Sequence, residues 1–182
     1  MNSVFKKRNQ KGFTLIEAMV SVGVMGVGIL SLLPIFTKGL NANYQTQIQF
    51  IAQQKAQEAM ESIFTARDTR LVTSAQIFNV SEGGIFLDGP QPLYAAGPDG
   101  LYGTADDDSS NPDSIIVAPG PDKMFGTADD VTINLNPFMN RTIQIVPDAK
   151  QTNLKDITIT IKWTYAGQTS SYVLQGCISN FD

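Results

Sequence analysis

The feature that most constrains this chain is an unbroken apolar run close to its start. Residues 13–36 read FTLIEAMVSVGVMGVGILSLLPIF and contain a single ionisable side chain. A secretory signal peptide has an apolar region of only about 7–15 residues, followed by small residues at its cleavage site. A run of 24 residues is instead long enough for a helix across a hydrocarbon core, which needs about 20. We therefore expect a membrane-spanning helix.

The charges that precede this run predict its orientation. Lys6, Lys7, Arg8 and Lys11 all lie in the first twelve residues, which contain no acid. Basic residues stay on the cytoplasmic side, so the N-terminus is expected in the cytoplasm and the remainder is expected to be exported. The whole chain has a net charge of −4, so the remainder alone carries −8. An acidic exported part argues against nucleic acid or anionic lipid as its main partner.

Two residues inside the apolar run are unusual. A charged group such as Glu17 costs about 2.5–3.5 kcal/mol at membrane depth on insertion scales. Glu17 is therefore either a charge tolerated at the membrane edge or a group that meets a positive partner within the membrane. Pro34 has no backbone N–H to donate, so it predicts a kink in the helix.

The residues around the start of the run resemble the class III signal of type IV prepilins. The segment from Lys11 to Glu17 reads KGFTLIE, and it follows a short basic leader. The resemblance implies that prepilin peptidase cuts between Gly12 and Phe13 on the cytoplasmic side and methylates the new N-terminus at Phe13. It also implies that Glu17 aligns subunits, because its carboxylate can meet the amine of a neighbouring subunit.

This resemblance implies a structural role and no enzymatic one. Expected partners are other pilin subunits, prepilin peptidase, the inner membrane and the pilus assembly machinery. The expected location is the bacterial inner membrane, and then an extracellular pilus or a periplasmic pseudopilus. The start of the chain is most similar to minor pilins of the PilV kind. Two alternatives stay open: a minor pseudopilin of a type II secretion system, and a membrane-anchored calcium-dependent adhesin. The chain has no histidine, and no catalytic arrangement is recognisable.

Beyond the apolar run the chain becomes polar but keeps helical periodicity. Apolar residues recur every three or four positions, which predicts one long helix from Phe13 that ends between Ala66 and Thr69. Its second half is expected to lay this stripe on a sheet. The stripe consists of Tyr44, Ile48, Ala52, Ala56, Ala59 and Ile63.

The C-terminal part alternates between apolar and polar residues. Residues 143–146 and 157–165 have this pattern, which predicts strands. Residues 166–169 predict a hairpin connection to a returning strand, in which we expect Cys177 to be a buried thiol. Weaker strand candidates are residues 84–87, 114–117 and 131–135.

Together these patterns predict a pilin-like α+β fold, in which a long N-terminal helix packs on a C-terminal antiparallel β-sheet. The expected divisions are a cleaved leader (1–12), a transmembrane and assembly helix (13–36), an amphipathic helix (37–69), a loop region (70–130) and the antiparallel sheet (131–182).

The loop region contains one acidic motif twice. Residues 97–107 and 120–130 share the pattern G-P-D-x-x-x-G-T-A-D-D. Closely spaced carboxylates in Gly-Pro turns can supply the six to eight oxygens that Ca²⁺ prefers, so the repeat favours a Ca²⁺ site. Soluble turns without metal are the alternative, because Gly, Pro and Asp also form ordinary turns. The candidate ligands are Asp99, Asp106, Asp107 and Asp108 in the first copy and Asp122, Asp129 and Asp130 in the second.

Overall fold

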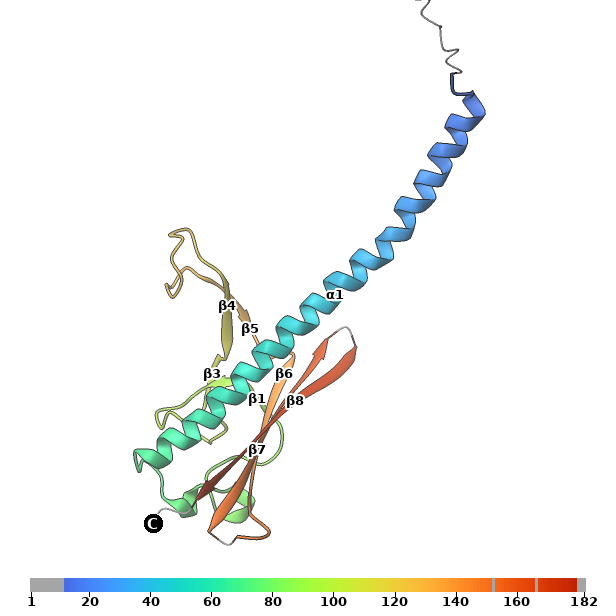
Figure 1. Ribbon diagram of the computed structural model, residues 1–182. Coiled ribbons are helices and arrows are strands. Elements are labelled where there is room, and N and C mark those ends of the chain that lie inside the picture. The colour runs from blue at the N-terminus through green and yellow to red at the C-terminus, as the bar shows by residue number, and fades with distance from the viewer. Residues whose placement is uncertain (1–11, 152, 166, 180–182) are drawn as a thin grey trace, which may run out of the picture. The chain divides into compact units, whose positions relative to one another are not determined.

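The computed structural model describes residues 12–151, 153–165 and 167–179. The chain divides into two compact units, Met1–Gln45 and Thr46–Asp182. One helix, α1 (Leu15–Asp68), begins in the first unit and ends in the second (Figure 1). The expected long helix is therefore present, and its last residue, Asp68, lies inside the predicted range.

The first unit presents its apolar side chains to the outside. Leu15, Val22, Leu30 and Phe36 are all more than half exposed, as are most of their large apolar neighbours. By length and composition, this part of α1 meets the requirements for a membrane-spanning helix. Its hydroxyl groups bond to their own helix, for example Ser21 Oγ to the Glu17 carbonyl at 2.7 Å. Such bonds satisfy polar groups where no water is present.

The second unit contains a four-stranded antiparallel sheet in the order β1-β6-β7-β8. Its strands are β1 (Gln91–Pro92), β6 (Met139–Pro147), β7 (Leu154–Tyr165) and β8 (Gln168–Ser179). Strand β7 pairs with both long neighbours without a shift in register, so Ile159 lies opposite Ile143 on one side and Leu174 on the other. The predicted hairpin between β7 and β8 is confirmed.

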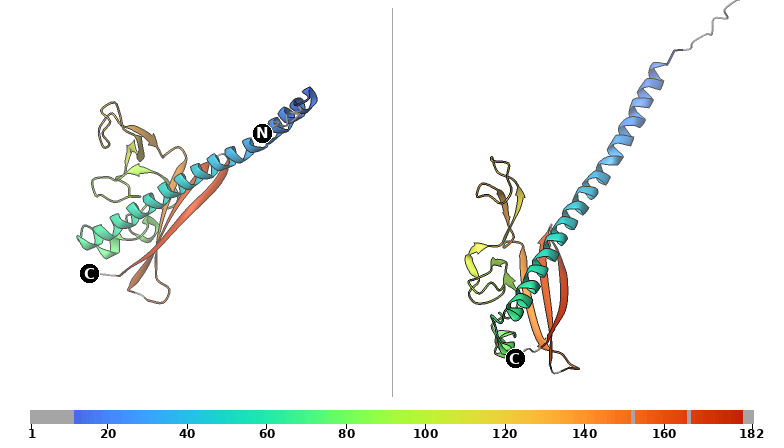
Figure 2. Two further views of the ribbon diagram at one scale, coloured as in Figure 1. Left: turned by 45° about the horizontal axis from the view of Figure 1, so that its top comes forward. Right: turned by 60° about the vertical axis from the view of Figure 1, so that its left-hand side comes forward.

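The core of this unit lies between the second half of α1 and one face of the sheet. The helix contributes mainly small side chains, among them Ala52, Ala56 and Ala59, all fully buried. Small residues let the helix backbone approach the sheet, where Ile157 and Ile159 are equally buried. The predicted α+β fold is therefore confirmed. Figure 2 shows the second half of α1 lying along the sheet from two further directions.

The segment between helix and sheet has little regular structure. It contains the short 3₁₀ turns η1 (Ser74–Gln76) and η2 (Val80–Glu82) and two small hairpins. The first hairpin pairs β2 (Tyr94–Ala95) with β3 (Asp108–Pro112), and the second pairs β4 (Ser114–Ala118) with β5 (Val131–Asn134).

Two of the three weaker strand predictions in or near this segment are confirmed, by β4 and β5. The prediction for residues 84–87 is wrong, because Phe86 forms only an isolated bridge with Asn79. The Asn79 side chain bonds instead to β6, donating to the Ile143 carbonyl and accepting from the Ile145 N–H, both at 2.8 Å. Asn79 thus completes the part of the β6 edge that the two-residue strand β1 does not reach.

The expectation of a buried thiol is also wrong, because Cys177 is exposed. Strand β8 turns alternate residues to the core, and the residue it buries here is Ile178, which is 2% exposed. Cys177 lies opposite Asp156 on the outer face of the sheet. The predicted alternation is one residue out of phase at this end of the strand.

Candidate functional site

The N-terminal motif forms the first turn of α1. Gly12 and Phe13 precede the helix, and Phe13 is 82% exposed. The hydroxyl of Thr14 accepts a hydrogen bond from the backbone N–H of Glu17 at 3.3 Å. This bond caps the helix, because the first N–H groups of a helix have no partner within it. Residues 1–11 of the basic leader lie outside the described residues. The predicted cleavage between Gly12 and Phe13 and the predicted methylation of Phe13 stay predictions.

Glu17 lies in the first turn of the helix, with its side chain exposed among apolar neighbours. Within the described residues its carboxylate forms no ion pair. The predicted role of Glu17 in subunit alignment therefore stays a prediction.

Pro34 lies inside the helix, which continues on both sides of it. The hydroxyl of Thr37 donates to the carbonyl of Pro34 at 3.0 Å and to that of Leu33 at 3.4 Å. The kink predicted at Pro34 stays a prediction.

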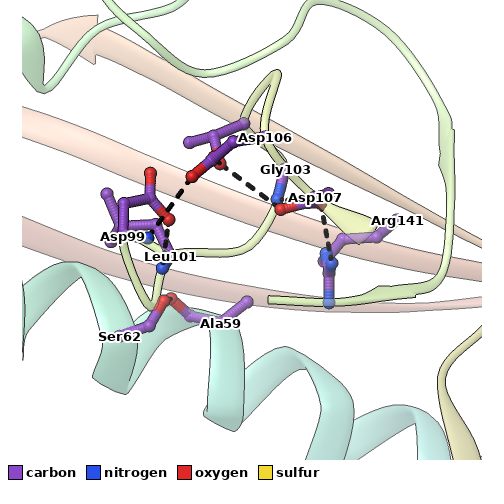
Figure 3. Close-up of polar contacts among 9 residues, drawn as sticks. Ala59, Ser62, Asp99, Leu101, Gly103, Asp106, Asp107 and Arg141 are labelled. Carbon is purple, nitrogen blue, oxygen red and sulfur yellow. Dashed lines mark hydrogen bonds and ion pairs between the residues drawn. The ribbon is translucent and has the colours of Figure 1, made fainter. Parts of the chain in front are cut away.

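The two acidic motifs fold into two separate loops that have the same conformation. In the first loop, Asp99 accepts the backbone N–H of Leu101 at 2.8 Å, and Asp107 accepts that of Gly103 at 2.8 Å. The peptide N–H of Asp99 bonds across the loop to the Asp106 carboxylate at 3.3 Å (Figure 3). The second loop repeats all three bonds: Met124 to Asp122 at 2.8 Å, Gly126 to Asp130 at 2.6 Å, and Asp122 to Asp129 at 3.1 Å.

These bonds explain why the motif contains its glycines. Gly97 lies against the backbone of Asp106 so closely that a Cβ atom would be 2.3 Å from the Asp106 carbonyl oxygen. Gly120 has the same relation to Asp129, also at 2.3 Å. A larger residue at either position would force the loop open, so the repeat encodes a defined loop shape.

The carboxylates of both loops point back to their own backbone. In the first loop, burial raises the pKa of Asp99, while the hydroxyl of Thr104 holds the pKa of Asp106 below its usual range. Asp108 lies outside the loop at the start of β3, where it accepts from Ser110. Among the described residues, no three acidic, histidine or cysteine side chains form a group that could hold a metal ion. The Ca²⁺ site stays a prediction.

The loops differ in what surrounds them. Leu101 of the first loop is fully buried, and a Cβ atom on Gly103 would be 2.9 Å from the Ile143 side chain of β6. The corresponding Met124 of the second loop is 63% exposed, and Gly126 has open space around it. The first loop is therefore docked on the sheet and the second is not.

Sequence reasoning missed the residue that receives the first loop, Arg141 of β6. Its side chain is 1% exposed, and its guanidinium lies 4.6 Å from the centre of the Tyr102 ring and 3.9 Å from Asp107 Oδ2. Figure 3 shows Asp107 between Gly103 and Arg141. Burial lowers the pKa of Arg141 and raises that of Asp107, and the attraction between the two charges opposes both shifts. The alternation of β6 places position 141 in the core, but no rule of patterning predicts an arginine there.

A second buried cation holds the helix to the segment between β3 and β4. Lys55 of α1 pairs with Asp113 and with Glu58, both at 2.9 Å. Burial opposes the charge on Lys55, but these two carboxylates outweigh it and leave its pKa raised.

Comparison with known proteins gives one family match, which is confined to the start of the chain. Residues 7–33 match the family model of the prokaryotic N-terminal methylation motif. No curated protein and no solved structure matches the chain.

Proposed function

We propose that the chain is a structural subunit of a type IV pilus or a related filament, because residues 7–33 match the prokaryotic N-terminal methylation motif and begin a long apolar helix. In this proposal prepilin peptidase removes residues 1–12 and methylates Phe13. The subunit then leaves the inner membrane and assembles with other pilin subunits through the first half of α1. The proposed role is structural and not enzymatic.

The observation that carries the proposal is the continuous apolar surface directly after the motif. None of the side chains in the membrane-spanning window of α1 is buried. Soluble proteins rarely expose apolar surface on this scale, so the segment requires an apolar environment. A bilayer provides it before assembly, and the packed helices of neighbouring subunits provide it afterwards.

Processing is tested by co-expressing the full chain with a prepilin peptidase and measuring the intact mass of the product. We expect the mass of residues 13–182 plus one methyl group, located on Phe13 by fragmentation. An inactive peptidase, and a Gly12→Val substitution, serve as controls that leave the chain uncut. A full-length chain in the presence of active peptidase, or a cut beyond residue 36, contradicts the proposal.

We further propose that the chain is a minor subunit. The support is the similarity of its start to minor pilins of the PilV kind. Purified filaments, analysed by quantitative mass spectrometry, should contain this chain in much smaller amount than another pilin. Equal or greater abundance would make it a major subunit. Filaments found only in the periplasm would favour the type II pseudopilin alternative.

A further inference from the structure

The two copies of the acidic motif differ in their packing, because the first loop is docked on the sheet and the second is exposed. The packing of the first loop therefore indicates what kind of surface fits the second. In the first loop, Leu101 inserts into the core and Tyr102 lies under the guanidinium of Arg141 at 4.6 Å. The same guanidinium faces the carboxylate of Asp107 at 3.9 Å. The receiving surface therefore combines an apolar pocket with a buried arginine.

The second loop has the same backbone bonds and chemically matching side chains, but no receiving surface within the described residues. Met124 corresponds to Leu101, Phe125 to Tyr102 and Asp130 to Asp107. Met124 and Phe125 are 63% and 68% exposed, and the bonds that shape the loop involve the backbone of Met124 but neither of the two side chains.

The hairpin that presents this loop is also poorly covered. Strands β4 and β5 form a two-stranded sheet by themselves, and Ile116, Val117, Val131 and Ile133 are each more than two-fifths exposed. A two-stranded hairpin is only marginally stable in water unless another surface packs on it. The exposed apolar residues thus extend from the loop tip along both strands.

We propose that the loop of residues 120–130 docks on a neighbouring protein subunit that presents an arginine beside an apolar pocket. Met124 fills the pocket, the guanidinium stacks on the ring of Phe125, and Asp130 faces it from the side. The occupant is a protein because the first loop shows this motif on a protein surface. Arginine is expected rather than lysine, because its planar guanidinium can stack on an aromatic ring and face a carboxylate at once.

The charge of the loop argues against a membrane as the occupant. Asp122, Asp129 and Asp130 outnumber the single cation of the loop, Lys123, so an anionic lipid surface would repel the exposed tip. This inference rests on the proposed function in one respect only, namely that the neighbouring subunit is a component of the same filament.

The test replaces the exposed tip in the full chain, in cells that assemble the filament. For the double variant Met124→Ser, Phe125→Ser, the amount of this chain in the sheared filament fraction should fall by about tenfold. This is the effect expected when an apolar anchor of an interface is lost. The matched control is Met124→Leu, Phe125→Tyr, which copies the tip of the first loop and should assemble like the wild type. Neither pair alters the bonds that shape the loop, so both variants should fold.

A second measurement identifies the occupant. A photoreactive benzoylphenylalanine at position 124 is irradiated in assembled filaments, and the cross-linked peptides are located by mass spectrometry. We expect a cross-link to an apolar surface beside an arginine on another filament subunit. The yield of this cross-link should fall several-fold with Phe125→Leu, which removes the ring, and stay unchanged with Phe125→Tyr.

Three outcomes overturn the inference. These are assembly of the serine variant at the wild-type level, a cross-link to lipid or within the same subunit, and a cross-link whose yield is unchanged by Phe125→Leu. Failure of the proposed function is distinguishable from all three, because the wild-type chain would then be unprocessed and absent from filaments.

Discussion

At the scale of single residues, the most unusual group is Arg141, a cation with no hydrogen-bond partner among the described residues. Its three guanidinium nitrogens are all buried and unbonded. Its charge is balanced mainly by Asp107, whose side chain is 7% exposed. Removing one member of a buried pair leaves the other charge uncompensated, which costs more than the pair itself contributes.

We therefore expect Arg141→Met to destabilise the full chain in detergent by about 3 kcal/mol at neutral pH, measured by denaturant unfolding. The double variant with Asp107→Asn should recover much of this loss, because no buried charge is then left alone. Equal losses in the single and double variants would show that the two side chains are not coupled.

The pH dependence of this pair has a definite sign. Burial raises the pKa of Asp107 above its ordinary value of 3.8, so ionising it costs stability as the pH rises from the unfolded to the folded pKa. Arg141 opposes that cost. Arg141→Met should therefore raise the pKa of Asp107 further, and its destabilisation should shrink below that pKa, where Asp107 is neutral. Carboxylate titration by NMR and unfolding at several pH values measure both effects, and a pH-independent loss would contradict this account.

At the scale of elements, helix α1 packs closely on the sheet at Gly176 of β8. A Cβ atom there would be 3.1 Å from Met60 Cε and 3.2 Å from Met60 Sδ. A branched side chain at this position must displace Met60, which is itself 6% exposed.

Gly176→Val should consequently destabilise the chain by about 1–3 kcal/mol through overpacking. Met60→Ala alone should cost about 2–5 kcal/mol through the cavity it leaves. The double variant should cost less than the two together, since valine fills part of that cavity. Denaturant unfolding of the full chain in detergent measures all three, and simple additivity would show that the residues are not in contact.

The elements that could be predicted are those with long periodic patterns. The stripe around Ala52 and Ala56 and the alternation around Ile159 each repeat often enough to fix both the type of element and its buried face. The two-residue strands β1 and β2 carry no such pattern and form only because β6 and β3 lie beside them. Asn79, which completes the β6 edge, belongs to the same class, because its partners lie more than 60 residues away.

The part of the candidate site that lies within a few consecutive residues could be predicted from the sequence. The pattern of the acidic loops is contained in eleven consecutive residues, so the sequence reveals that both copies share a shape. Whether a copy docks depends on Ile143 and Arg141, which are distant in the sequence and match no motif. The difference between a docked and a free loop is therefore visible only in the folded unit.

At the scale of the whole molecule, the two units differ in the surroundings they require. The second has a core of its own, with fully buried residues on both helix and sheet. The first has an exposed apolar surface with one acid, Glu17, that no described residue neutralises. The apolar surface of the first unit is therefore covered only in a membrane or an assembly. A substitution there should affect assembly and leave the fold of the second unit intact.

Glu17→Gln separates these two requirements. If Glu17 meets the amine that cleavage creates on a neighbouring Phe13, the variant leaves that amine buried without a partner, a cost of about 3–5 kcal/mol. We expect normal cleavage by the peptidase and unchanged unfolding in detergent, with at least a tenfold loss from sheared filaments. Glu17→Asp, which keeps the charge, should retain part of the incorporation. If Glu17→Gln instead assembles like the wild type, the acid is merely tolerated at the membrane edge, and the register of the subunits must be set by the apolar surface alone.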